Sequence, residues 1–222
     1  MQLALYTSTV ADGSMKPLNK NDVARTAQAR EAFLQTQHIQ PSDTTCVRLE
    51  YGSNNYCRYQ TVDDLYRGDG ITRPSSLIVD GLVATKPGHV LFLPLADCIG
   101  AVLHDPIKNI LMVSHLGRHN LEQFGGTKSV EYLVDEHGVD PKNLIVWLSP
   151  AAGSEHYPLF AFENRSMHDV AAEQLLKASV ASQHITSSTI DTTKDESYYS
   201  HSEFLKGNRS TDGRFAIVAI MR

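Results

Sequence analysis

The chain has 222 residues, of which 41% are hydrophobic and 20% are charged, a balance that is ordinary for a folded globular protein. Its net charge of −5 at pH 7 argues against a general nucleic-acid or anionic-membrane binder, and no run of Lys or Arg occurs. No apolar stretch approaches the ~20 residues that a membrane-spanning helix needs. We therefore predict one domain over residues 1–222, with neither nucleic acid nor membrane as a partner.

Cysteine usage and the first residues of the chain bear on its compartment. The three cysteines, Cys46, Cys57 and Cys98, are an odd number and lack the C-x-x-C spacing of a zinc knuckle or redox pair. The first sixteen residues have neither the positively charged start nor the long apolar segment of a secretory signal. Reduced thiols and a cytoplasmic location are the resulting expectations. No feature of the sequence predicts an oligomeric state.

The first quarter of the chain predicts one strand, one helix and a hairpin. A strand is expected over 3–7, followed by a helix over 23–37. The helical segment is rich in Ala, Gln, Arg and Glu, and it follows an Asn-Asp pair that suits a helix cap. Strands are expected over 44–50 and 56–61, and the turn-forming residues 52–55 between them favour a hairpin.

The middle of the chain is dense in short apolar runs, which turn-forming Pro, Gly and Asp residues separate. These runs are nearly continuous in hydrophobicity, whereas strands with one solvated face alternate. We therefore expect strands that are covered on both faces. The predicted strands are 76–84, 89–95, 100–104, 109–114 and 144–148.

The remaining elements alternate helix with strand. Helices are predicted over 121–137, ending at Gly138, and over 167–182. Residues 197–205 are expected to be a short helix or irregular, and the apolar run FAIVAIM at 215–221 predicts a buried closing strand. Because no repeat or linker divides the chain, the pattern predicts a single layered α/β domain.

Reactive side chains follow two of the buried runs, where each predicted strand ends. Cys98 comes after the run LPLAD, and His115 comes after LMVS. Strand ends hold side chains on a rigid backbone, so they commonly carry sites. A thiol and an imidazole placed together could form a nucleophilic thiolate–imidazolium pair, or they could be two ligands of a zinc or copper ion. The spacing of 17 residues leaves both open, together with a buried inert cysteine and a surface histidine.

Two further segments are weaker candidates. His119 follows His115 by four residues, a spacing that can bring both to one face of a turn or helix start. The segment STDGR at 210–214 offers hydroxyl, carboxylate and guanidinium groups that could hold a phosphate or ribose, although a simple turn explains it as well. His104 precedes an Asp-Pro turn and is expected to be solvated.

Several of these segments together resemble one protein family, the laccase-domain (multicopper polyphenol oxidase-like) family. Its "aDa-v-T", "ADC", "Dp" and "HaGWrG" segments resemble, in order and spacing, the residues 79–85, 96–98, 105–106 and 115–117. Its "GPaIG…Y" loop and "fFSyR…tGRma" ending resemble residues 149–157 and 198–214. The resemblance covers nearly the whole chain.

The resemblance implies an α/β/α sandwich with a mixed central sheet and a site of one Cys and two His that bind zinc or copper. It implies a purine nucleoside as substrate, split by phosphate or deaminated; polyphenol oxidation was the family's first association. Some members are linked to editing of peptidoglycan precursors, and the fold resembles Cys/His deamidases, which keeps a metal-free hydrolase or amidase open. Cys98 and His115 match two of the ligands. The candidates for phosphate or ribose contacts are Arg30, Arg118, His119 and Arg214.

The chain departs from the family at two of these motifs. The family's first histidine belongs to a "QvHg" segment, whereas this chain has RLEYG at 48–52. Tyr51 aligns with the missing histidine, and Glu50 is a possible substitute, so metal affinity should fall. The tryptophan of "HaGWrG" is also absent. A degenerate member that binds a ligand without catalysis is therefore a third hypothesis, and the lack of H-x-H pairs argues against a true multicopper laccase.

Overall fold

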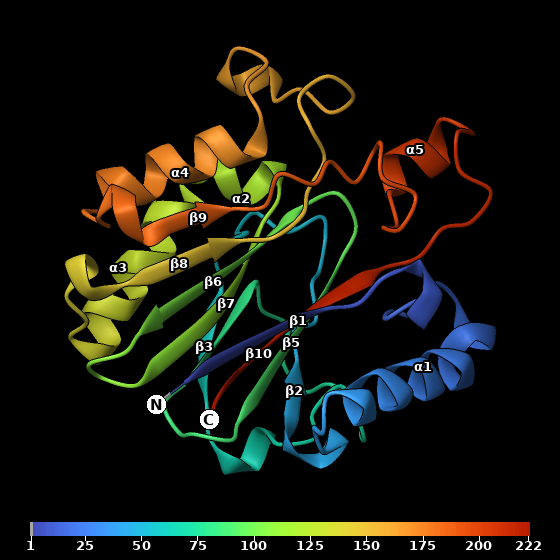
Figure 1. Ribbon diagram of the computed structural model, residues 1–222, viewed down its shortest axis with the longest axis horizontal. Coiled ribbons are helices and arrows are strands. Elements are labelled where there is room, and N and C mark those ends of the chain that lie inside the picture. Colours follow the sequence, from blue (N-terminus) through green and yellow to red (C-terminus); the bar gives the residue numbers. More distant parts are fainter. Residues whose placement is uncertain (1) are drawn as a thin grey trace.

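The computed structural model describes residues 2–222 (Figure 1), and in that range ten strands form two mixed sheets. The strands are β1 (Leu3–Thr7), β2 (Thr44–Cys46), β3 (Tyr59–Val62), β4 (Gly81–Ala84), β5 (Val90–Leu95), β6 (Ile99–Asp105), β7 (Ile110–Leu116), β8 (Ile145–Leu148), β9 (Ile185–Ser187) and β10 (Phe215–Met221). The α-helices are α1 (Val23–Thr36), α2 (Arg118–Glu122), α3 (Gly125–His137), α4 (Met167–Lys177) and α5 (His201–Leu205).

The smaller sheet has the order β1-β10-β5-β2, and the larger has the order β3-β4-β7-β6-β8-β9. Three pairs are parallel, namely β2 with β5, β3 with β4, and β8 with β9, and the other pairs are antiparallel. The chain ends lie side by side because β1 and β10 are neighbours (Figure 1). None of the helices in residues 2–222 is long and apolar enough to cross a membrane.

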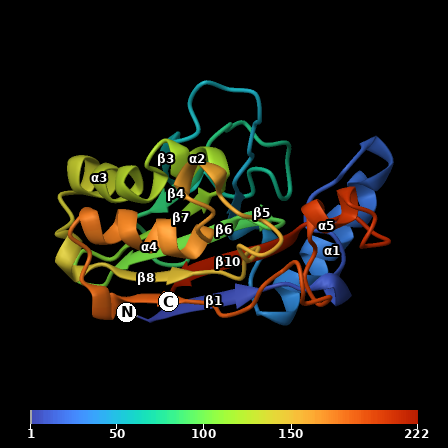
Figure 2. The same ribbon diagram turned by 90° about the horizontal axis from the view of Figure 1, so that it is seen from above.

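The two sheets stack face to face, and helices cover their outer sides. In β10, Phe215 and Ile217 belong to the core between the sheets, whereas Ala216 and Val218 pack toward α1. Helices α3 and α4 cover the outer face of the larger sheet, on the side of the molecule away from α1 (Figure 2). Strands covered on both faces explain the continuous apolar runs. The predicted α/β class and layered sandwich are confirmed, and the central layer consists of two mixed sheets.

The predicted hairpin over 44–50 and 56–61 is wrong. β2 pairs with β5 in the smaller sheet, while β3 pairs with β4 in the larger one. The predicted strand over 76–84 shortens to β4, because residues before Gly81 form no ladder. Turn-forming residues between two apolar runs indicate a change of direction, but not whether the two runs pair.

The predicted helix over 121–137 is broken in two. Phe124 takes a left-handed conformation with a φ of 62°, which ends α2 before α3 begins. The predicted stop at Gly138 is confirmed, since this residue has a φ of 61° at the end of α3. Helix α1 agrees with its predicted range, and its N-cap is Asp22, whose side chain makes no capping hydrogen bond. Asn19 caps the short turn Lys20–Asp22 before α1, accepting a hydrogen bond from the Asn21 N–H at 2.8 Å.

Two histidines lie inside the sheets. His104, expected in a solvated turn, is buried in β6, because it pairs with both Leu111 of β7 and Ile145 of β8. His89 is buried beside β5, where its Nε2 lies 2.8 Å from the Thr45 hydroxyl oxygen and its Nδ1 has no partner. Burial lowers the pKa of His89 from 6.5 to about 4.

Acid should weaken the fold through His89. Because its pKa is lower in the folded chain than in the unfolded chain, its contribution is complete above pH 6.5 and is lost as the pH falls toward 4. The loss amounts to at most about 3 kcal/mol. Urea unfolding at pH 7.5, 6 and 5 measures it, with His89→Gln as the control because glutamine does not titrate. Equal pH slopes for the two proteins would contradict this prediction.

Candidate functional site

The pairing of β6 with β7 brings Cys98 and His115 together. Gly100 lies opposite His115 in this ladder, and Ile99 lies opposite Leu116, so Cys98 falls across from Gly117. Cys98 packs against the core between the sheets. His115 lies on the face of β7 that packs into the same core. The 16 residues between them in the sequence therefore belong to one antiparallel hairpin, and both side chains occupy the same end of the inter-sheet space.

Gly117 makes room for both groups. A Cβ atom built on Gly117 would lie 2.7 Å from Cys98 Sγ and 3.1 Å from His115 Nε2. Both distances are shorter than ordinary contacts between a carbon and a non-bonded atom. The sulfur and the imidazole therefore occupy the same side of Gly117, in space that a side chain there would fill.

Gly117→Ala should displace this pair and lower the free energy of unfolding by about 1–2 kcal/mol, as overpacking of a buried site does. Urea unfolding at pH 7.5 measures the change. If the added methyl acts through the sulfur, the substitution costs less in a Cys98→Ala background, where the contact at 2.7 Å is gone. A cost that is the same in both backgrounds would show that the two residues are not in contact.

His115 is a buried base with no partner for its ring. Its side chain is 3% exposed, and neither ring nitrogen has a hydrogen-bond partner in the described structure. Burial lowers its pKa to about 4, against the opposing charge of Asp80, so the ring is neutral at pH 7. Its backbone N–H donates to the Asp80 carbonyl at 2.8 Å. Buried polar atoms rarely lack a partner, so these nitrogens mark a place where a bound group belongs.

Cys98 is half-buried, and its thiol is protonated at neutral pH. Burial and the charge of Asp97 raise its pKa to about 12, although the charges of Arg214 and Arg118 act in the opposite direction. His115 makes no hydrogen bond to the sulfur. A thiolate–imidazolium pair needs a low thiol pKa and a protonated ring, whereas burial raises the pKa of Cys98 and lowers that of His115.

Asp97 holds the loops around Cys98. It is buried, and its backbone has a left-handed conformation with a φ of 70°. One carboxylate oxygen accepts from the Thr192 hydroxyl at 3.2 Å, and the other accepts from the Ser202 N–H at 2.7 Å. Its backbone carbonyl accepts from the Ala152 N–H at 2.8 Å. Asp97 thus ties three distant segments to the residue before Cys98, a role that the sequence pattern did not indicate.

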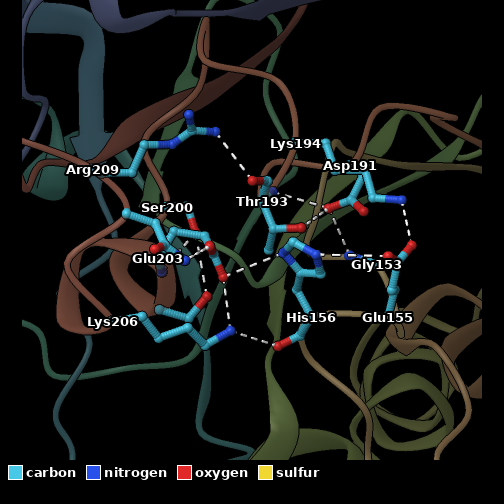
Figure 3. A network of polar contacts seen from close by, with 12 residues as sticks. Gly153, Glu155, His156, Asp191, Thr193, Lys194, Ser200, Glu203, Lys206 and Arg209 are labelled. Atoms are coloured by element: carbon cyan, nitrogen blue, oxygen red, sulfur yellow. Dashed lines mark hydrogen bonds and ion pairs between the residues drawn. The ribbon is translucent and has the colours of Figure 1, made fainter.

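A second network joins the same three segments to one another (Figure 3). Asp191 accepts from the Gly153 N–H at 2.9 Å, and the buried Glu203 accepts from Lys206 at 2.7 Å. Lys206 also donates to the His156 carbonyl at 2.9 Å, which closes the link between α5 and the loop after β8. Hydrogen bonds between segments that are remote in sequence therefore hold α5, the loop after β8 and the segment around Asp191 together.

The position of the family's first histidine holds no metal ligand of the usual kind. Glu50 forms an ion pair with Arg58, with the charged atoms 3.4 Å apart, and the Glu50 side chain is 53% exposed. Tyr51 is 61% exposed, and its phenol, with an ordinary pKa of 10 that desolvation and the neighbouring Cys98 raise further, keeps its proton at neutral pH. No three His, Cys, Asp or Glu side chains in residues 2–222 are gathered to hold a metal. Cys98 and His115 supply two suitable donors, and the three-ligand site that the resemblance implies is incomplete.

Two of the four predicted substrate-binding side chains lie near Cys98. The charges of Arg118, an exposed residue at the start of α2, and of Arg214 both lower the pKa of its thiol. Arg214 Nη1 also donates to Asp212 at 2.8 Å and to the Gly213 carbonyl at 2.6 Å. Cationic groups whose charge acts on Cys98 suit an anionic reactant.

The other two predicted side chains have structural partners of their own. Arg30 donates to the Met15 carbonyl at 2.8 Å and to the Gly70 carbonyl at 2.6 Å. The His119 ring stacks on Tyr56, with centroids 4.8 Å apart, and its Nδ1 lies 3.3 Å from Glu122. Both side chains are held in place by these contacts, and the charge of His119 also lowers the pKa of His115.

One protein family matches most of the chain. The family described as "Multi-copper polyphenol oxidoreductase laccase" matches residues 12–222 of the chain. The chain belongs to this laccase-domain family. The match includes the strands that carry Cys98 and His115.

Two curated proteins are similar over parts of the laccase-domain chain. "Purine nucleoside phosphorylase LACC1" of Mus musculus is 33% identical over 75 residues, which are 34% of this chain and 17% of that protein. "Purine nucleoside phosphorylase YlmD" of Bacillus subtilis is 25% identical over 132 residues, which are 54% of this chain and 46% of that protein. The matched segments thus span less than half of either relative.

Solved structures share the whole fold. The hypothetical protein YfiH of Bacillus licheniformis superposes with a TM-score of 0.84 at 17% identity, covering 100% of this chain and 93% of that one. YlmD of Geobacillus stearothermophilus gives a TM-score of 0.85 at 19% identity, covering 99% of this chain and 91% of that one. At these identities the similarity shows the α/β architecture alone.

Proposed function

We propose that this chain is an enzyme that acts on purine nucleosides, with Cys98 and His115 at the reacting centre. The observation that carries the proposal is the pair of unpartnered, buried His115 nitrogens beside the Cys98 sulfur. Relatives named purine nucleoside phosphorylase support this substrate class. Phosphorolysis is preferred to deamination, because the charges of Arg118 and Arg214 act on the same site and would favour phosphate.

The protonation states of the pair suit the departing base. In phosphorolysis a phosphate oxygen forms a bond to the C1′ atom of ribose, while the bond from C1′ to the purine breaks and its electron pair goes to the purine. A hydrogen-bond donor stabilises the charge that develops on that base. The neutral imidazole of His115 carries one N–H, and the Cys98 thiol keeps its proton because its pKa is about 12. Both groups can therefore donate toward the leaving purine.

The test is phosphate-dependent release of free base from adenosine, inosine and guanosine, followed by chromatography. His115→Ala and Cys98→Ala should each lower kcat/KM by about 100-fold or more, a typical loss for a group that donates in the transition state. Cys57→Ala is the matched control, since this half-buried cysteine lies 3.9 Å from the Asn120 carbonyl and outside the pair. Ammonia release without phosphate would assign deamination instead. No turnover of any of the three nucleosides would refute the proposal.

A second candidate is a laccase-domain protein that binds a nucleoside without transforming it. Tyr51 favours it, since this phenol takes the place of a metal ligand and keeps its proton. Calorimetry separates the two functions. Nucleoside binding without turnover, unchanged in Cys98→Ala, would support the second candidate over the first.

A further inference from the structure

Lys16 is a half-buried lysine that lies near both Tyr51 and His115. Its Nζ is 5.9 Å from the centroid of the Tyr51 ring, the side chain that aligns with the family's first histidine. Burial lowers the pKa of His115, and the charge of Lys16 lowers it further. Lys16 therefore brings a positive charge to the region where a complete three-ligand site would hold its metal ion.

The backbone around Lys16 is fixed to α1 and to the residue before β10. Met15 is fully buried, and its N–H donates to the Arg214 carbonyl at 2.7 Å. The Met15 carbonyl accepts from Arg30 Nε at 2.8 Å. The Ser14 hydroxyl donates to the Lys16 carbonyl at 2.8 Å and accepts from the Arg214 N–H at 3.1 Å. The lysine is therefore held at a defined position by contacts with two elements.

No carboxylate compensates the charge of Lys16 in the described structure. No Asp or Glu among residues 2–222 forms an ion pair with it, and burial together with the charge of Arg214 lowers its pKa. Asp80, the carboxylate whose charge acts on His115, is already paired with Arg58 Nε at 2.7 Å. An ammonium group that is partly removed from water without a counter-ion costs free energy, and an approaching negative charge offsets that cost.

The set of donors in the site explains why a cationic side chain is useful at this place. A metal ion held by three ligands acts as a Lewis acid and stabilises negative charge on a reacting group. Cys98 and His115 are suitable donors, but Tyr51 is a phenol that keeps its proton, so the third ligand is missing. Lys16 supplies the same sign of charge and needs no ligands. It also lines a cavity of about 510 Å³ beside α1, so a bound molecule can reach it.

We propose that Lys16 takes the electrostatic role that a metal ion has in a complete three-ligand site, so that the reacting centre works without a metal. This role of Lys16 rests on the proposed function. When the bond from C1′ to the purine breaks, its electron pair goes to the purine, and the ammonium charge of Lys16 stabilises the negative charge that develops there. No oxidant, reductant or further co-reactant enters this step.

Turnover measurements on the full chain test this role directly. Lys16→Gln should lower kcat for the best nucleoside substrate by about tenfold and change KM by less than about twofold, because a charge that acts on the developing anion acts mainly in the transition state. Lys16→Arg keeps the positive charge and should keep most of the activity. Lys20→Gln, at an exposed lysine on the short turn before α1, is the matched control and should be unchanged. Dialysis against a chelator should leave kcat unaltered.

Zinc affinity gives a readout that does not depend on turnover. In a Tyr51→His background, which supplies a third ligand, a positive charge at Lys16 should repel the bound ion. Adding Lys16→Gln or Lys16→Met should therefore raise the zinc affinity by about tenfold, the effect of a unit charge a few ångströms from a divalent ion near a protein surface. Adding Lys16→Arg or Lys20→Gln should leave it unchanged. The two neutral substitutions keep the test valid if one of them does not fold.

Three results would overturn the inference. They are turnover that a chelator abolishes and zinc restores, an unchanged kcat in Lys16→Gln, and zinc affinities in the Tyr51→His background that are the same with and without the Lys16 charge. Coupling between Lys16 and zinc in a chain that turns over none of the nucleosides would refute the proposed function and leave the placement of the Lys16 charge supported.

Discussion

Replacing Tyr51 with histidine should raise the affinity of this chain for zinc by about 100-fold or more, because it adds the third protein ligand that zinc sites usually need. Cys98 and His115 already present a sulfur and an unpartnered ring nitrogen on the same side of Gly117. Tyr51 lies close enough to Cys98 for the charge of Cys98 to raise the pKa of the Tyr51 phenol. The Kd for zinc, measured by competition with a chromophoric chelator, tests this.

Two controls tie the gain to the predicted site. Tyr51→Phe removes the phenol without supplying a donor, so it should leave zinc affinity unchanged. The double substitution Tyr51→His with Cys98→Ala should lose most of the gain, since one of three donors is missing again. A gain that survives without the sulfur would mean that the new histidine binds zinc elsewhere.

Asp97→Ala should lower the free energy of unfolding by about 3 kcal/mol. The substitution leaves the buried Thr192 hydroxyl and Ser202 N–H without their acceptor, at about 1–3 kcal/mol for each unsatisfied group. It also places alanine at a φ of 70°, where Asp and Asn are tolerated better than residues without a short polar side chain. Urea unfolding with a fixed m-value measures the loss.

Asp97→Asn is the matched control for this prediction. Asparagine keeps one oxygen acceptor and suits the left-handed backbone, so it should cost about 1 kcal/mol, the net value of one hydrogen bond. The order of the two variants is the test. Equal losses would show that the negative charge of Asp97, and not its two hydrogen bonds, stabilises the loops.

Local elements were predictable where one pattern dominates a short segment. The helix over 23–37, the stop at Gly138 and the closing strand 215–221 all agree with the structure, in the last case residue for residue. Helix propensity, a glycine stop and an uninterrupted apolar run act over a few neighbouring residues. The site pair was predictable for a related reason, since Cys98 and His115 follow buried strands.

Features that depend on distant partners were not predictable in this way. The segments 44–50 and 56–61 look like a hairpin, yet they enter different sheets because β5 and β4 offer them parallel partners. The broken helix at Phe124 is another case, since its left-handed backbone is unusual for an aromatic residue and no local signal marks it.

The sequence by itself determined the fold class, the strand ends that carry Cys98 and His115, and the missing ligand at Tyr51. Only the tertiary structure decided that the sulfur and the imidazole lie together on one side of Gly117, and that Asp97 holds Thr192 and Ser202. The reason is physical: propensity and hydrophobic period act between near neighbours, whereas burial, pKa and hydrogen-bond partners depend on which distant segments pack together.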